Sequence, residues 1–125
     1  MAEVNLPEVV AEVRAAFEGY EKALMANDVA ALNGYFWNSP HTLRYGVGEI
    51  LHGFEQIKSF RSASRAPARR LENTRITAFG RDHAVANTEF YRENSPRCGR
   101  QSQTWVRMPE GWRIVCAHVS MIDLP

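Results

Sequence analysis

The chain has 125 residues, of which 45% are hydrophobic and 23% charged, a composition typical of one folded globular domain. Fifteen Lys and Arg residues against 14 Asp and Glu residues leave a formal net charge of +1, which offers no overall field to attract nucleic acid or an anionic membrane. No apolar run approaches the roughly 18 residues of a bilayer-spanning helix, and acids occupy the N-terminus where a signal peptide carries bases. We therefore expect a single domain over residues 1–125 that is cytoplasmic and binds neither nucleic acid nor membranes.

The first part of the chain is predicted to be helical. Over residues 7–27, apolar residues recur at alternating steps of three and four, which predicts an amphipathic helix with Tyr20 in its buried stripe. A second short helix is expected at residues 29–35, before an aromatic loop that contains Trp37. Pro40 ends this loop and prevents a helix from continuing through it.

A hairpin, a third helix and a sheet are predicted next. Residues 42–45 and 49–52 flank a Gly-Val-Gly turn, and residues 54–65 resume a helical period. Four successive antiparallel strands, separated by turns and a loop, then follow at residues 71–79, 83–92, 100–108 and 112–121. Because the helices precede the sheet, we expect an α+β fold with helices packed on one face of a curved, mostly antiparallel sheet, and a ligand cavity between the two layers.

Positive charge is concentrated in one stretch of the chain. Residues 58–107 hold eleven bases against four acids, and every one of those bases except Lys58 is an arginine. The planar guanidinium fork binds a carboxylate through two hydrogen bonds at once, whereas lysine offers only a point charge. This pattern favours a small acidic ligand.

Tyr20 and Arg44 are the first candidates for chemistry, and each has two interpretations. Tyr20 is either a structural core residue or a phenol that projects into the cavity as a proton donor. Arg44 alternates with Leu43 in a short predicted strand, so it either faces solvent or lies inside, where it must meet an anion. Arg61 and Arg65 are four residues apart, which indicates either a solvated helix face or a second contact for a carboxylate.

Further candidates for ligand contact are expected on the last two strands. Simple alternation places His118 and Ser120 on the same face as Ile114, where they either line the cavity or, for the histidine, form part of the core. Gln103 and Trp105 share a face of the preceding strand and could orient a polar ligand.

Several common kinds of site are missing from the sequence. The four histidines show no metal-ligand spacing, and the glycines form no nucleotide-binding motif and no nucleophile elbow. Cys98 lies beside Arg97 and Arg100 in the sequence, but no histidine is adjacent to activate it. We therefore expect no metal, no cofactor and no covalent nucleophile.

Six segments together resemble the AtzH-like family, within the nuclear transport factor 2-like superfamily, which is also called SnoaL-like or cystatin-like. They are the end of the first helix, YEKAL, at residues 20–24, the FW loop at 36–37, TLRYGVGEILHG at 42–53, FRSASR at 60–65, GRQSQTWVRM at 99–108 and GWRIVCAHVSMID at 111–123. The resemblance covers nearly the whole chain. It implies a cone-shaped α+β fold whose sheet encloses a cavity, and a homodimer formed through the outer face of the sheet.

The resemblance also implies an activity, the conversion of 1,3-dicarboxyurea to allophanate by hydrolysis or decarboxylation. Such an enzyme would act beside an amidase-signature hydrolase in the breakdown of cyanuric acid or related nitrogenous compounds. Tyr20 and Arg44 match the expected catalytic pair, with Arg44 holding a carboxylate and Tyr20 protonating the nitrogen that leaves. Trp37, Arg61, Arg65, Gln103, Trp105, His118 and Ser120 are the expected substrate-binding residues.

Two other classes of function stay open at this point. One is a non-catalytic accessory subunit that binds a metabolite or an amidase-signature hydrolase. The other is a SnoaL-like isomerase or cyclase, and such enzymes commonly place an aspartate in the cavity. The sequence offers no clear equivalent, because Asp123 is nearly terminal.

Overall fold

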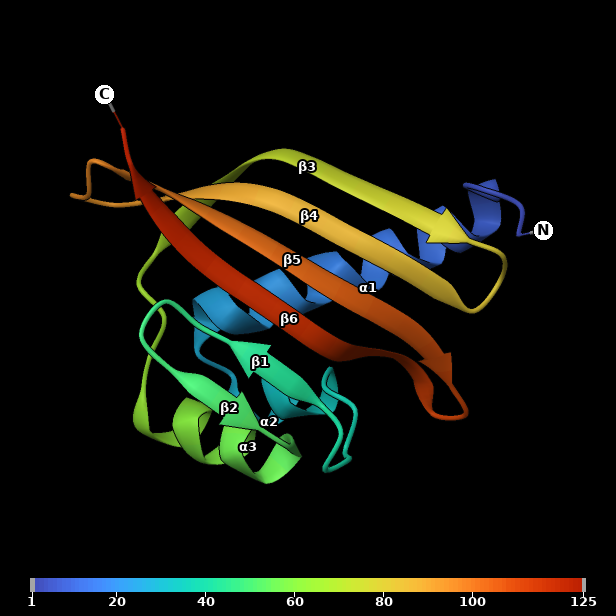
Figure 1. Cartoon of the computed structure of the whole chain (residues 1–125), viewed down its shortest axis with the longest axis horizontal. Coiled ribbons are helices and arrows are strands. Elements are labelled where there is room, and N and C mark those ends of the chain that lie inside the picture. The colour runs from blue at the N-terminus through green and yellow to red at the C-terminus, as the bar shows by residue number, and fades with distance from the viewer. Residues whose placement is uncertain (1, 125) are drawn as a thin grey trace.

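The computed structural model describes residues 2–124, and within them three helices pack against one six-stranded sheet (Figure 1). The elements are α1 (Pro7–Ala26), α2 (Val29–Gly34), β1 (Leu43–Tyr45), β2 (Ile50–His52), α3 (Phe54–Ala63), β3 (Arg69–Phe79), β4 (His83–Arg92), β5 (Arg97–Met108) and β6 (Gly111–Asp123). Every helix and strand predicted from the sequence is present, with small differences at the ends. None of the helices within residues 2–124 is long and apolar enough to cross a bilayer.

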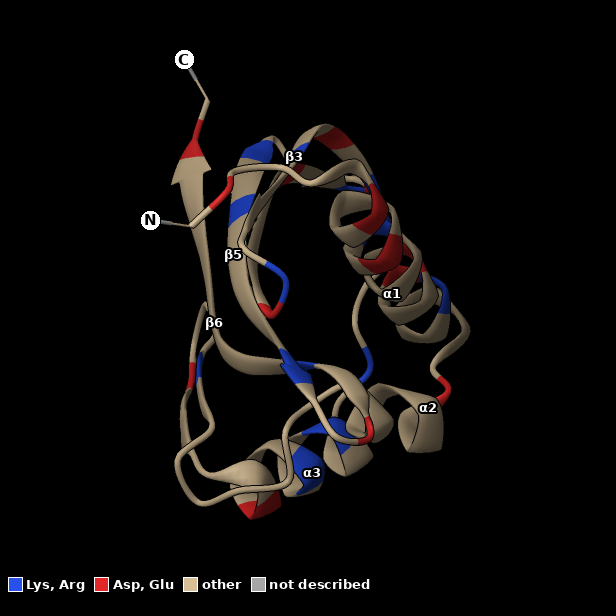
Figure 2. Ribbon diagram, turned by 90° about the vertical axis from the view of Figure 1, so that its right-hand side faces the viewer, with Lys and Arg blue, Asp and Glu red and all other residues tan. Residues whose placement is uncertain are grey.

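The sheet has the strand order β2-β1-β6-β5-β4-β3. Only β1 and β6 pair in parallel, and all other neighbours are antiparallel, so the predicted α+β class is confirmed. The long strands β3 to β6 curve strongly, with α1 lying across their concave face and α2 and α3 at one end of the molecule (Figure 2). This curvature brings the ends of distant strands toward the same space.

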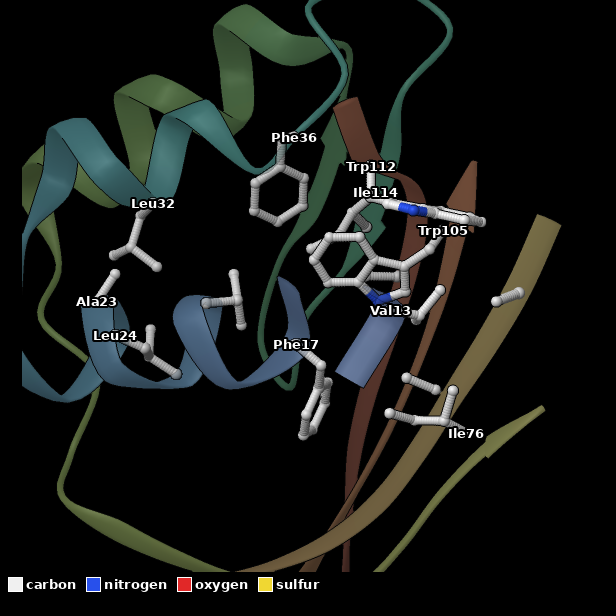
Figure 3. Close-up of a cluster of buried hydrophobic side chains, with 14 of the residues drawn as sticks. Val13, Phe17, Ala23, Leu24, Leu32, Phe36, Ile76, Trp105, Trp112 and Ile114 are labelled. Carbon is white, nitrogen blue, oxygen red and sulfur yellow. The ribbon is translucent and has the colours of Figure 1, made fainter. Parts of the chain in front are cut away.

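The core lies between α1 and the sheet. Val13 and Phe17 of α1 face Trp105, Ile76 and Ile114 of the strands, and all five side chains are buried (Figure 3). Complete burial of a large apolar side chain contributes about 1.5–3 kcal/mol, so this cluster fixes the helix on the sheet. The predicted buried stripe of α1 is confirmed.

Helix ends follow the local chemistry of the chain. Pro7 begins α1, and Asn27 ends it in the left-handed conformation at φ 54°. The Asp28 side chain then accepts a hydrogen bond from the backbone N–H of Ala31 and caps α2.

A bulge in β6 changes which side chains face the core. In the β5–β6 register, Val115 is an extra residue between Ile114 and the residues that follow. Consequently Ile114 is buried before the bulge and Ala117 after it, while His118 is exposed. The prediction that His118 and Ser120 share a face with Ile114 is wrong, because it assumed an unbroken alternation.

Ion pairs join α1 to the sheet along the acidic side of the helix (Figure 2). At Glu12, the carboxylate accepts hydrogen bonds from the Trp112 indole N–H at 2.9 Å and from the Arg107 guanidinium at 2.7 Å. The bond from Trp112 and then that from Arg107 lower the pKa of Glu12 below its ordinary value of 4.5.

This lowered pKa makes the contribution of Glu12 to stability depend on pH. Because the folded pKa lies below the unfolded one, the stabilisation is fully present above pH 4.5 and is lost as the pH falls through the folded pKa. We expect Glu12→Gln to lower the free energy of unfolding at pH 7 and to differ progressively less from wild type as the pH drops to about 3. Urea unfolding across this range measures the difference, with Glu18→Gln on the exposed face of α1 as the control. An equal difference at every pH would contradict the assignment.

Candidate functional site

A small pocket of about 80 Å³ lies where the β1–β2 hairpin, α3 and the connection from α3 to β3 meet the concave end of the sheet. The charged residues in its lining are one carboxylate and four arginines, namely Glu49, Arg44, Arg61, Arg65 and Arg92. Four larger hollows lie elsewhere on the surface of residues 2–124, and none of these four is lined by a buried charged side chain. We therefore take the arginine-lined pocket as the candidate site.

Arg44 points into the protein from the middle of β1. Its neighbours across the ladders are Leu51 of β2 and Ala117 of β6, and only 9% of its surface is exposed. The Nη1 atom donates to Glu49 Oε1 at 2.8 Å, and the guanidinium lies 5.4 Å from the centre of the Phe60 ring. The structure thus decides between the two interpretations, because Arg44 is buried against an anion.

The hairpin turn places Glu49 over Arg44. Glu49 also accepts a hydrogen bond from the Gly48 backbone N–H at 3.2 Å, which fixes the carboxylate at the turn. A Cβ atom at Gly46 would collide with this carboxylate, whereas one at Gly48 would meet no atom within 4 Å. Glycine at position 46 is therefore what lets Glu49 fold back onto the arginine.

Arg61 is a buried charge in the pocket that no acid of the described chain pairs with. It lies near the end of α3 with 8% of its surface exposed, and its guanidinium is 5.4 Å from the centre of the Phe60 ring. Among residues 2–124, it forms no ion pair and no side-chain hydrogen bond. Burial, more than any neighbouring charge, lowers the pKa of Arg61, and the positive charge of Arg44 adds to this. A buried cation of this kind is suited to bind an anion.

Tyr20 adjoins this group from α1. Its surface is 3% exposed, and its ring makes edge-to-face contacts with Tyr35 and Phe36, at 6.1 and 6.0 Å between centroids. The hydroxyl forms no hydrogen bond with another group in residues 2–124, and it lies close enough to Arg61 for the two groups to interact electrostatically. Tyr20 is thus packed as a core residue and also presents a free hydroxyl on the side of Arg61, although it is not part of the pocket lining.

Arg92 was not predicted from the sequence. It is the last residue of β4 and pairs across the ladder with Arg69 of β3, and both guanidinium groups pack on the Phe90 ring, at 5.5 and 4.6 Å. Arg69 is held by Glu21 through two hydrogen bonds of 2.9 and 2.6 Å and by Gln101 at 3.1 Å. Burial, and then the charge of Arg69, lowers the pKa of Arg92. No local pattern marks a strand-end arginine as a pocket residue.

The AtzH-like family matches the sequence over residues 2–125. This chain belongs to the AtzH-like family. No curated protein matches it.

Solved structures give the AtzH-like chain close relatives. A protein of unknown function from the DUF3225 family of Pectobacterium atrosepticum is 56% identical with a TM-score of 0.93, covering 96% of this chain and 95% of that one. A cystatin-like fold protein from Burkholderia xenovorans is 48% identical with a TM-score of 0.96, and each chain is covered completely. An NTF2-like protein of unknown function from Pseudomonas putida, 14% identical with a TM-score of 0.75 over 90% of this chain and 86% of that one, shares the fold alone. The NTF2-like fold is confirmed.

The prediction that Arg61 and Arg65 share one face of a helix is only partly met in this protein. The helix α3 ends at Ala63, so Arg65 lies in the connection that follows and Arg69 begins β3. Arg65 is exposed at the pocket, whereas Arg61 is buried in it. These two arginines meet the same pocket from a helix and from a loop, and the regular helical spacing of four does not extend across them.

The predicted residues on β5 lie in the core instead of the pocket. Trp105 is fully buried, and its indole N–H donates to Gln103 Oε1 at 3.1 Å. The two polar groups therefore satisfy each other inside the protein. Trp37 stacks on His41 at 6.2 Å between ring centroids and does not line the pocket either.

The predicted residues on β6 lie on the outer face of the sheet. His118 packs edge-on against Tyr45, with 5.5 Å between ring centroids. Ser120 accepts two hydrogen bonds from Arg100, at 3.1 and 3.0 Å. Neither residue contacts the arginine-lined pocket, because the bulge turned both of them outward.

The two glycines of the hairpin provide a matched test of the Glu49 placement. Gly46→Ala forces the Glu49 carboxylate away from Arg44 and should lower the free energy of unfolding by about 1–2 kcal/mol. Gly48→Ala meets open space and should change it by less than about 0.5 kcal/mol. Chemical denaturation at neutral pH measures both variants. Equal effects would show that the turn backbone, and not the carboxylate, sets the requirement for glycine.

Proposed function

We propose that this protein is an enzyme that acts on small carboxylated ureas and converts 1,3-dicarboxyurea to allophanate. The observation that carries the proposal is Arg61, a buried guanidinium without a protein acceptor among residues 2–124, in a pocket lined by three further arginines. The reaction itself is what membership of the AtzH-like family suggests. The pocket supports it by the sign of its charge.

The substrate fits the chemistry of this lining. A dicarboxylated urea carries two carboxylates on a short planar frame, and guanidinium groups bind carboxylates through paired hydrogen bonds. Four arginines face a single carboxylate, Glu49, so the pocket is strongly positive and favours an anion.

The reaction needs one proton and no covalent nucleophile. The bond between a terminal carboxylate carbon and the urea nitrogen breaks, the electron pair stays on nitrogen, and the carbon departs as CO2. Tyr20 donates the proton that the nitrogen takes up, and solvent later restores the hydroxyl. Attack of water on the same carbon would give bicarbonate in place of CO2 and leave the same allophanate.

The parts of the substrate that Arg44 and Arg61 contact can be assigned from the change in charge during the proposed reaction. The departing carboxylate loses its charge in the transition state, so a cation bound to it contributes to substrate binding and does not speed the breaking of the bond. We therefore assign Arg44 and Arg61 to the carboxylate that stays and to the urea oxygen, where negative charge develops.

Release of allophanate and CO2 from freshly generated 1,3-dicarboxyurea, measured against the spontaneous reaction, tests the proposal. We expect wild type to accelerate release, Tyr20→Phe to be slower by about 10²–10⁴-fold in kcat, and Arg44→Gln to lose at least about 10²-fold in kcat/KM. Tyr45→Phe removes a hydroxyl from the outer face of β1 and should stay within about twofold of wild type.

Three outcomes would change this assignment. Wild type that gives no acceleration would contradict an enzyme of this specificity. If it altered the rate of an amidase-signature hydrolase without consuming that enzyme's product, the accessory role would replace the catalytic one. If Tyr20→Phe kept full turnover while Arg44→Gln lost it, the assignment of Tyr20 as proton donor would be contradicted and that of Arg44 as anion contact would stand.

A further inference from the structure

We infer that Arg92 forms a second anion contact, opposite Arg44, and makes the pocket selective for linear dicarboxylates over monocarboxylates. This deepens the proposed function and rests on it, because it concerns the ligand of the same pocket. Arg92 is partly buried at the end of β4 and lines the pocket with Arg44 and Arg61. Its selectivity follows from its position, its lack of a protein partner and the charges around it.

The position comes from the curvature of the sheet. In the strand order, β6 and β5 separate β1, which carries Arg44, from β4, which carries Arg92. In a flat sheet these strands would lie about 14 Å apart, at about 4.8 Å per strand spacing. The sheet is strongly curved (Figure 2). Arg44 and Arg92 line the same small pocket, and from their places on separate strands we infer that they approach a ligand from two sides.

Phe90 supports Arg92 from within the protein. The ring is fully buried, with the guanidinium of Arg92 at 5.5 Å and that of Arg69 at 4.6 Å from its centre. Gly99 on the neighbouring strand makes room for it, since a Cβ atom there would collide with the ring. The aromatic face thus positions Arg92 without using its N–H donors.

The donors of Arg92 are not used by a neighbouring acid. Its ladder partner Arg69 is bound to Glu21 through two hydrogen bonds, whereas Arg92 forms no ion pair or side-chain hydrogen bond among residues 2–124. Arg44 is likewise engaged, by Glu49. Arg61 and Arg92 are therefore the two partly or fully buried guanidiniums of the lining without a counter-ion from the described chain.

Two such guanidiniums distinguish a dianion from a monoanion. One carboxylate can be held by Arg61 and Arg44, and a second carboxylate at the other end of a short ligand reaches Arg92. Loss of CO2 from a dicarboxylate removes this second contact. Allophanate, with one carboxylate, should consequently bind more weakly than the substrate and leave the pocket.

Glutarate and butyrate provide a stable pair of probes. Glutarate has the five-atom backbone of 1,3-dicarboxyurea but no carbon–nitrogen bond to break, and butyrate is the same chain without one carboxylate. We expect wild type to bind glutarate at least about tenfold more tightly than butyrate in titration calorimetry at constant ionic strength. In Arg92→Gln, the affinity for glutarate should fall about tenfold while that for butyrate stays within about twofold.

Matched variants separate a direct contact from a general effect of charge. Arg75→Gln removes one exposed arginine from β3 outside the pocket and should leave both affinities within about twofold. Arg92→Lys retains the charge without the planar fork and should recover part of the glutarate affinity. Thermal unfolding of each variant verifies that it is folded.

Certain results would overturn the role of Arg92. One such result is that wild type binds neither probe or binds both with the same affinity. Another is that Arg92→Gln lowers the affinity for both probes equally or lowers neither. The dicarboxyurea assay separates this failure from that of the proposed function. If wild type turns over dicarboxyurea but does not prefer glutarate, only the proposed role of Arg92 is contradicted. If the preference for glutarate depends on Arg92 but dicarboxyurea is not turned over, the proposed reaction is contradicted and the anion subsite at Arg92 stands.

Discussion

Burying a guanidinium destabilises a protein unless an anion or an acceptor meets it, and this constraint shapes the concave end of the sheet. Arg69 is met by Glu21 and Arg44 by Glu49, each within 3 Å. Arg61 and Arg92 are not met by an acid of the described chain. The guanidinium of Arg61 lies 5.4 Å from the centre of the Phe60 ring and that of Arg92 lies 5.5 Å from the centre of the Phe90 ring, contacts that use none of their N–H donors. The stability of this region and its affinity for an anion therefore have the same origin.

The interface between α1 and the sheet combines an apolar core with charged groups. Apolar side chains of α1 pack around Trp105, whose indole N–H donates to Gln103 within this core. Tyr20 lies between the core and the charged groups around Arg61. A rigid apolar core thus holds the charged groups in place, as a preorganised site requires. The homodimer and the amidase-signature partner expected from the family stay predictions.

The sequence was sufficient for the elements and insufficient for the pocket, for identifiable reasons. Helix α1 and the long strands repeat their apolar pattern over many residues, so periodicity located them closely. Strand β1 has only three residues, and alternation alone could not decide that Arg44 points inward. His118 and Ser120 were placed on the wrong face because nothing local marks the extra residue Val115. Arg92 reaches the pocket through the curvature of the whole sheet, a property that short-range patterns do not contain.

The bonds between α1 and the sheet also bear on how a ligand enters. Arg107 holds α1 near its first turns through Glu12, and Arg69 holds it near its last turns through Glu21. The helix is thereby fastened at both ends and cannot lift from the sheet without breaking an ion pair. The connection at residues 64–68 contributes Arg65 to the lining and belongs to neither a helix nor a strand. The rate of ligand entry and exit would then depend more on this segment, which lines the pocket, than on α1, which contributes no residue to the lining.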